Sequence, residues 1–207
     1  TRPQEDVTGE LGRHGWVQVY PPREEDSRRD MPKRAKAAGF KTLVLTVDVP
    51  VGSRGERQVR SGLTTPPRLT PRLMAQIAKC PRWAIGQARM GSPRMRLIDD
   101  YSERLSGLSS TNHAGYLLRT SPDMDYLRWL REAWQGPMIV KGVLGAEDAA
   151  RLQAEGVDAL WISNHAGRQF DAAPATIEVL PDIRKACTLP LIIDGGFESG
   201  LDILRAY

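Results

Sequence analysis

Short apolar segments alternate with amphipathic segments along most of the sequence, which predicts a regular succession of strands and helices. Runs rich in Val, Ile and Leu are expected to be strands, at residues 16–20, 41–48, 138–141, 158–163 and 189–194. Segments with helix-forming residues and end signals are expected to be helices, at residues 27–38, 121–134, 146–155 and 176–186. The run at 41–48 is almost continuously apolar and β-branched, which is typical of a strand buried on both faces.

Prolines and small polar residues mark the expected helix starts. Pro32 is expected in the first turn of the helix at 27–38, whereas Ser121 and Pro122 provide an N-cap and a first-turn proline for the helix at 121–134. Residues 201–207 have the pattern of the middle of a further helix, so we expect a fragment of a longer protein.

The succession of strands and helices predicts a parallel sheet, because parallel neighbours need a long crossover that a helix can supply. Polar residues follow each strand, so we expect the chemistry at the carboxyl ends of the strands. A (β/α)8 barrel is organised in this way, whereas a doubly wound nucleotide-binding fold has a glycine-rich turn after its first strand, which this sequence lacks. Five strands do not close such a barrel, so the expected α/β fold is an incomplete (β/α)8 TIM barrel.

A basic insertion interrupts the pattern after the second expected strand, at about residues 55–115. Between residues 57 and 98 it holds nine basic residues and no acidic one, although the net charge of the whole chain is only +4. Leu69, Leu73, Met74, Ile77 and Ala78 recur at helical spacing. Attachment to an anionic membrane surface and a solvated, mobile loop over an active site both fit this pattern. Nucleic acid fits less well, because the basic charge is confined to one insertion.

The composition excludes several classes of protein. With 207 residues and 41% hydrophobic content the chain can bury a sizeable core, and no apolar run approaches the roughly 18 residues that a membrane-spanning helix requires. Cys80 and Cys187 lie far apart without clustered histidines, so we expect neither a disulfide framework nor a metal site. A reducing, cytoplasmic location fits these features.

The segment after the fourth expected strand, Ser163-Asn-His-Ala-Gly-Arg-Gln-Phe-Asp171, carries the strongest candidates for chemistry. His165 can take a proton near neutral pH, and Arg168 can hold a carboxylate through two parallel hydrogen bonds. Asp48, which follows the second expected strand, is the natural carboxylate partner for the imidazole. A structural histidine and a loop-capping aspartate are the alternatives for these positions.

Two further strand ends carry groups suited to a ligand. Lys141 ends an apolar strand, where a charge is costly unless it meets an anion, so we expect it to face negative charge on a cofactor or an enolate. A lysine that extends to the rim with its stem buried is the alternative. The glycines of Asp194-Gly-Gly196 would allow the backbone to pass close to a ligand.

These strand ends together resemble the FMN-dependent 2-hydroxy acid oxidase and dehydrogenase family, which includes L-lactate dehydrogenases, glycolate oxidase and (S)-mandelate dehydrogenase. The matching motifs are Trp16-Val-Gln-Val-Tyr20, Leu45-Thr-Val-Asp-Val-Pro50, Ile139-Val-Lys-Gly-Val143, Ser163-Asn-His-Ala-Gly-Arg-Gln-Phe-Asp171 and Ile193-Asp-Gly-Gly196. The motif that contains His165 is highly specific, and the motifs span nearly the whole chain. The resemblance implies that about strands 3 to 7 of the barrel are present, in one partial domain over residues 1–207 that includes the basic insertion.

The resemblance also implies a role for each matching position. His165 matches the base that removes a proton from an (S)-2-hydroxy acid, and Asp48 matches its carboxylate partner. Arg168 matches the arginine that binds the substrate carboxylate, and Tyr20 a tyrosine near the substrate. The implied cofactor is FMN, and the positions that match its contacts are Gln18, Thr46, Lys141, Ser163, Asp194 and Gly196. The implied reaction is oxidation of the acid to the 2-oxo acid, with L-lactate placed ahead of mandelate and glycolate.

Three positions depart from the family pattern. Gly55 stands where members usually carry a substrate-contacting arginine, Glu198 where many carry an arginine on the FMN phosphate, and Ala166 where glycine is common. Together with the missing strands, Gly55 and Glu198 support the alternative of a truncated or degenerate barrel that binds a ligand or a partner chain without catalysis.

The basic insertion gains a meaning from the resemblance. In the membrane-associated dehydrogenases of this family, the loop after the fourth strand helps to attach the enzyme to the bilayer. The resemblance therefore favours a quinone or another respiratory-chain electron acceptor over oxygen. It implies peripheral binding to an anionic membrane surface, on the inner face of the cytoplasmic membrane. A homo-oligomer is expected for the full-length protein, and nucleic acid is not an expected partner.

Overall fold

The computed structural model describes residues 14–50, 56–62, 69–91 and 120–207. The described residues form a five-stranded sheet with helices packed around it. Its strands are β1 (Trp16–Val19), β2 (Thr42–Thr46), β3 (Met138–Val143), β4 (Ala159–Ile162) and β5 (Leu191–Ile193). All neighbouring strands are parallel, and their spatial order is their order in the chain. The predicted strands and the predicted parallel sheet are therefore confirmed.

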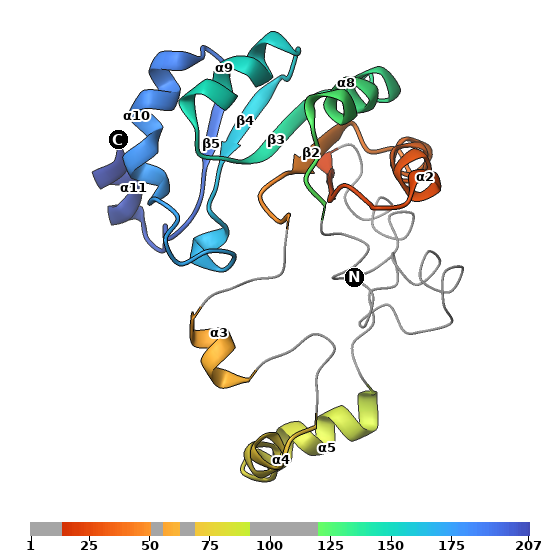
Figure 1. The fold of residues 1–207 in the computed structure, drawn as a ribbon, viewed down its shortest axis with the longest axis vertical. Coiled ribbons are helices and arrows are strands. Elements are labelled where there is room, and N and C mark those ends of the chain that lie inside the picture. The colour runs from red at the N-terminus through yellow and green to blue at the C-terminus, as the bar shows by residue number, and fades with distance from the viewer. Residues whose placement is uncertain (1–13, 51–55, 63–68, 92–119) are drawn as a thin grey trace.

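Helices connect the strands and cover the outer side of the sheet (Figure 1). They are α2 (Glu25–Ala37), α8 (Met124–Ala133), α9 (Ala146–Ala154) and α10 (Thr176–Ala186), and a further helix, α11 (Gly200–Ala206), follows β5. Between one strand and the next the chain forms at least one of these helices, so that it can return and add the next strand in parallel. The predicted helix at 176–186 has the same bounds as α10.

Two separate cores lie on the two faces of the sheet, because successive residues of a strand point to opposite faces. In the larger core, Leu43 of β2 and Leu160 of β4 pack with Leu130 of α8, and all three are 0% exposed. On the opposite face, Val44 and Ile139 belong to a smaller buried cluster. The run at 41–48 is thus buried on both faces of β2, as predicted.

The start of α2 differs from the prediction. The helix begins at Glu25, two residues earlier than expected, because Glu25 and Asp26 in the first turn suit the positive end of the helix dipole. Pro32 therefore lies inside the helix and is buried there, so its predicted place in the first turn is wrong.

The N-cap of α8 also differs from the prediction. The cap is Asp123, whose carboxylate accepts a hydrogen bond from the Tyr126 backbone nitrogen at 2.8 Å, and not Ser121. An aspartate at the residue before the helix satisfies a free backbone N–H as well as a serine does, and its charge favours the same end of the helix.

Within the predicted insertion at 55–115, the structure describes α3 (Glu56–Ser61), α4 (Pro71–Ala78) and α5 (Pro81–Met90). Its other residues, Gly55 among them, lie outside the described part of the chain. α4 confirms the helical spacing found in the sequence, and no residue of α4 or α5 is buried. Both helices lie apart from the sheet in Figure 1. Across the described ranges, no helix combines the length and the apolar character needed to cross a membrane.

Candidate active site

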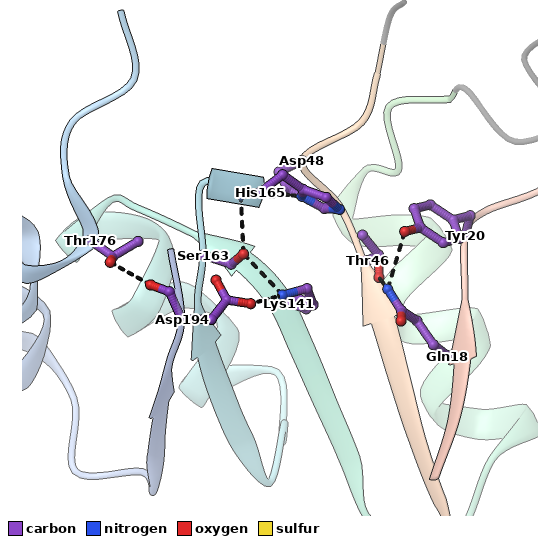
Figure 2. A network of polar contacts seen from close by, with 9 residues as sticks. All are labelled: Gln18, Tyr20, Thr46, Asp48, Lys141, Ser163, His165, Thr176 and Asp194. Carbon is purple, nitrogen blue, oxygen red and sulfur yellow. Dashed lines mark hydrogen bonds and ion pairs between the residues drawn. The ribbon is translucent and has the colours of Figure 1, made fainter. Parts of the chain in front are cut away.

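Polar side chains from all five strands and the turns after them gather at one edge of the sheet (Figure 2). The edge is shared because the strands are parallel neighbours and their carboxyl ends lie on the same side. The side chains drawn there are Gln18, Tyr20, Thr46, Asp48, Lys141, Ser163, His165, Thr176 and Asp194. All of them except Thr176 are candidates that the sequence identified, and the structure brings these candidates to one edge of the sheet. Arg168 and Gly196, which the sequence also identified, are not among the residues drawn there.

His165 and Asp48 form a hydrogen-bonded pair between the ends of β4 and β2. His165 Nδ1 lies 2.5 Å from Asp48 Oδ2, and the two side chains are 16% and 14% exposed. An ionised carboxylate can only accept hydrogen bonds, so Nδ1 carries the proton of the neutral imidazole. Nε2 then has the free lone pair and is the nitrogen that can take a proton from a ligand.

The backbone at His165 adopts a left-handed conformation. His165 and Ala166 have φ angles of 52° and 53°, within the short 3-10 helix η2 (His165–Gly167) that follows β4. This conformation costs a residue with a side chain on the order of 1 kcal/mol. The Ser163 hydroxyl supports the turn by accepting a hydrogen bond from the His165 backbone nitrogen at 3.2 Å. The same conformation explains why glycine is favoured at the position of Ala166.

Gly142 leaves the space that Asp48 occupies. A Cβ atom at Gly142 would lie 2.4 Å from Cγ of Asp48, and the φ of Gly142 is +103°, so glycine is required for two reasons. The register between β3 and β4 shifts just beyond Lys141, which is the mark of a bulge. The Val47 backbone nitrogen donates a hydrogen bond to the Lys141 carbonyl at 3.0 Å and fastens the segment before Asp48 to β3. The sequence motif contained this glycine, but its role in positioning Asp48 was not predicted.

Lys141 meets negative charge, as its place in an apolar strand predicted, but the partner in the structure is the Asp194 carboxylate and not a cofactor or an enolate. Its ammonium forms an ion pair with Asp194 and donates a hydrogen bond to Ser163 Oγ at 3.0 Å. Lys141 is 7% exposed, so its charge lies in a partly dehydrated position. Thr176, which the sequence did not single out, donates a hydrogen bond to the Asp194 carbonyl at 2.5 Å and holds the turn after β5. Desolvation offsets much of the attraction in a buried ion pair, so this pair contributes little to the net stability of the sheet.

Gln18 and Tyr20 occupy the end of β1. Gln18 Nε2 donates hydrogen bonds to Thr46 Oγ1 at 2.8 Å and to the Tyr20 hydroxyl at 3.2 Å. Burial raises the pKa of the Tyr20 hydroxyl, the negative charge of Asp48 raises it further, and the positive charge of Arg168 opposes the change. Tyr20 is therefore protonated at neutral pH and lies within electrostatic reach of Asp48 and Arg168.

The glycines after β5 lie beside the polar network and have positive φ angles, but only Gly196 leaves open space beside the backbone. Gly195 has a φ of +98°, and a Cβ atom there would lie 2.8 Å from the Asn164 side-chain oxygen. Gly196 has a φ of +124° and is exposed, with nothing within 4 Å of the position of a Cβ. Glu198, which stands in the place of the family arginine, is also exposed, and its backbone nitrogen donates a hydrogen bond to Asp202.

The surroundings of Tyr20 give a prediction about its ionisation. Asp48→Asn removes a negative charge that disfavours the tyrosinate, so the pKa of Tyr20 is expected to fall towards 10.0. Arg168→Gln removes a stabilising positive charge, so the pKa is expected to rise. Ultraviolet absorbance during an alkaline titration measures both shifts, with Tyr20→Phe as the reference. Shifts in the opposite directions would contradict the placement of the three side chains.

The sequence matches a known family over its whole length. Residues 1–207 match the family described as FMN-dependent dehydrogenase. Relatives include the L-lactate dehydrogenase of Serratia proteamaculans (strain 568), 37% identical over 209 residues, and that of Caulobacter vibrioides (strain NA1000 / CB15N), 39% identical over 196 residues. These matches cover 98% and 92% of this chain but 54% and 50% of the relatives. The chain therefore spans about half the length of the curated relatives it matches.

Solved structures of similar proteins agree with the family match. The crystal structure of the monotopic membrane protein (S)-mandelate dehydrogenase has a TM-score of 0.85 and 33% identity, covering 99% of this chain and 54% of that chain. The structure of mandelate oxidase has a TM-score of 0.68 and 27% identity, covering 99% of this chain and 50% of that chain. The resemblance drawn from the strand-end motifs is thereby confirmed, and this chain belongs to the FMN-dependent dehydrogenase family.

Proposed function

We propose that this chain carries the central part of an FMN-dependent enzyme that oxidises an (S)-2-hydroxy acid to the 2-oxo acid, with L-lactate as the first candidate substrate. The observation that carries the proposal is the His165–Asp48 pair, which leaves a proton-accepting nitrogen at the edge of the sheet that also holds Lys141. The similarity to curated L-lactate dehydrogenases supports the choice of substrate, and the family supports the cofactor.

The sheet is interpreted as an arc of a (β/α)8 barrel, corresponding to about strands 3 to 7. Parallel strands in chain order, with helices on their outer side, support this interpretation. The polar groups at the carboxyl ends also support it, because that end of the barrel carries the chemistry in enzymes with this fold. Residues 1–207 are accordingly proposed to form one partial barrel domain, in which residues 55–115 are the basic insertion.

The residues at this edge fit a flavin, whose polar ring edge calls for hydrogen-bond donors and a positive charge. Lys141 provides a buried ammonium, and Gln18 provides a side-chain amide. Asp194 Oδ1 is buried without a hydrogen-bond partner among the described residues, so it can accept a hydrogen bond from a ribityl hydroxyl. The residues proposed to hold FMN are Gln18, Thr46, Lys141, Ser163, Asp194 and Gly196. Glu198 would repel the phosphate, so weaker FMN binding is expected than in relatives with arginine there.

His165 is proposed as the base of the reaction. Its Nε2 removes a proton from the substrate, and the Asp48 carboxylate stabilises the imidazolium that forms. Arg168 binds the substrate carboxylate through two parallel hydrogen bonds, and Tyr20 donates a hydrogen bond to the substrate from its protonated hydroxyl. FMN, when bound, supplies the acceptor for the two electrons. Lys141 provides a fixed positive charge beside the developing negative charge.

A truncated or degenerate barrel that binds a ligand or a partner chain without catalysis is the alternative. Glu198 in place of an arginine and Gly55 in place of a second arginine favour it. β1 and β5 are the outer strands of the described sheet, and such edges can pair with another chain.

A visible absorbance spectrum distinguishes the two proposals. In the full-length protein, FMN is expected to bind and to bleach when L-lactate is added without oxygen. His165→Gln is expected to keep the bound flavin but to slow the bleaching by about 10²- to 10⁴-fold, because it removes the general base. His14→Gln is the matched control, since His14 is exposed and outside the polar network, and it should leave the rate unchanged. Bound flavin that no 2-hydroxy acid bleaches would favour the degenerate barrel.

The basic insertion is proposed to attach the protein to an anionic membrane surface. The basic residues in and directly after α4 and α5 are Arg72, Lys79, Arg82 and Arg89. The exposed large apolar residues of the two helices are Met74, Trp83, Ile85 and Met90. Such a segment binds lipid headgroups through its charge and the acyl boundary through its apolar side chains.

The membrane surface proposed for this attachment is the inner face of the cytoplasmic membrane. The inner face of the cytoplasmic membrane carries anionic lipid and would give access to a quinone or another respiratory-chain acceptor. The similarity to the monotopic membrane protein (S)-mandelate dehydrogenase supports peripheral attachment. A homo-oligomer stays a proposal for the full-length protein.

Vesicle co-sedimentation tests the attachment. Binding is expected to require anionic lipid and to weaken as salt is raised, because the attraction is screened. Arg82→Glu changes the charge by two units, so at roughly 1 kcal/mol for each unit near the surface it is expected to weaken binding by about 30-fold. Arg205→Glu on α11 is the matched control, because Arg205 is exposed far from the insertion in the chain. Binding that is independent of salt or of anionic lipid would contradict the proposal.

A further inference from the structure

Trp161 lies directly against the Lys141 ammonium. The two residues are paired in the register of β3 and β4, and Lys141 Nζ lies 4.1 Å from the centroid of the indole ring. Side chains alternate along β4, so Trp161 and Ser163 are on the same face of the sheet, with Trp161 one layer further from the carboxyl edge. The ammonium is therefore bounded by the indole ring on one side and by Ser163 and Asp194 on others.

The indole N–H of Trp161 also lacks an acceptor within the described part of the chain. Trp161 Nε1 is buried and has no hydrogen-bond partner among the described residues. A buried tryptophan N–H usually finds an acceptor, because leaving it unpaired costs free energy. Trp161 as a whole is partly buried, and its side chain packs against the small buried cluster of Val44, Ile139 and Ala159. A fixed ring with an unused donor, beside a buried cation, indicates that a ligand provides the missing acceptor.

We propose that Trp161 is a positioning residue for Lys141 and a hydrogen-bond donor to the flavin. The face of the indole ring holds the ammonium by cation–π attraction, and the indole N–H donates to a polar group of the bound flavin. This inference rests on the proposed function and adds a residue to the same site. Ser163 and Asp194 hold the ammonium through hydrogen bonding and charge, whereas the ring of Trp161 fixes its distance from β4.

Two substitutions separate the ring from the indole N–H. Trp161→Phe keeps an aromatic face but removes the donor, whereas Trp161→Leu removes both. Trp129→Phe is the matched control, because Trp129 is also partly buried but packs against the larger core on the other face of the sheet. It lies on α8 with its ring against Tyr126, at a centroid distance of 5.6 Å. Circular dichroism establishes that each variant of the full-length protein is folded before it is compared.

Two quantities are measured, the affinity for FMN and the midpoint potential of the bound flavin, and the variants should affect them differently. FMN affinity, measured by quenching of flavin fluorescence, should fall by about 30-fold in Trp161→Leu and about fivefold in Trp161→Phe. The midpoint potential of the bound flavin should fall in Trp161→Leu. Without the indole ring, the Lys141 ammonium is no longer held beside the flavin, whose reduced form its positive charge stabilises. In Trp161→Phe the midpoint potential should remain close to that of the unaltered protein, because the phenyl ring still holds the Lys141 ammonium. Trp129→Phe should change neither quantity.

Several outcomes would overturn the inference. One is a Trp161→Leu protein with unchanged affinity and potential, and another is a Trp161→Phe protein whose potential falls as far as that of Trp161→Leu. If the unaltered protein binds no FMN, the proposed function fails, and amidination of lysines followed by mass spectrometry still tests the positioning. Trp161→Leu should then raise the labelling rate of Lys141 several-fold relative to the exposed Lys185, and an unchanged ratio would overturn the role of the ring.

Discussion

The contact between Gly142 and Asp48 is the constraint on which the geometry of the candidate active site depends. The backbone of β3 passes so close to the Asp48 carboxyl group that a Cβ atom would overlap with it. The bulge in β3 makes this approach possible, and the hydrogen bond from Val47 to Lys141 keeps the two strand ends together. Asp48 then reaches His165 across the sheet and fixes which imidazole nitrogen faces a ligand.

The paired charged side chains of the site lie in partly buried positions. His165 pairs with Asp48, and Lys141 pairs with Asp194, so these two basic groups each have an acidic partner from another strand end. Such pairs add little net stability because they must be dehydrated, and the stability of the sheet comes instead from the apolar cores on its two faces. In the proposed function the first pair handles the proton, and the second places positive charge beside the cofactor.

The sequence predicted the sheet and most of the site, because long apolar strands and the polar residues after them are local signals. It predicted that Lys141 meets negative charge because an unpaired buried charge is costly, but it assigned that charge to a ligand, whereas the structure pairs Lys141 with Asp194. It did not reveal the roles of Gly142 and Trp161, because each depends on a neighbour from another strand. The starts of α2 and α8 differ from the prediction because carboxylates, and not the nearby prolines, lie at the N-terminal ends of these helices.

The most direct test is the low-field proton resonance of His165 Nδ1–H, measured by nuclear magnetic resonance in the unaltered protein and in Gly142→Ala. A strong hydrogen bond to the Asp48 carboxylate should give this signal in the unaltered protein, and Asp48→Ala identifies it by removing it. The account predicts that Gly142→Ala also loses the signal, because the added Cβ displaces Asp48. A signal that persists in Gly142→Ala, or that is absent from the unaltered protein, would contradict it.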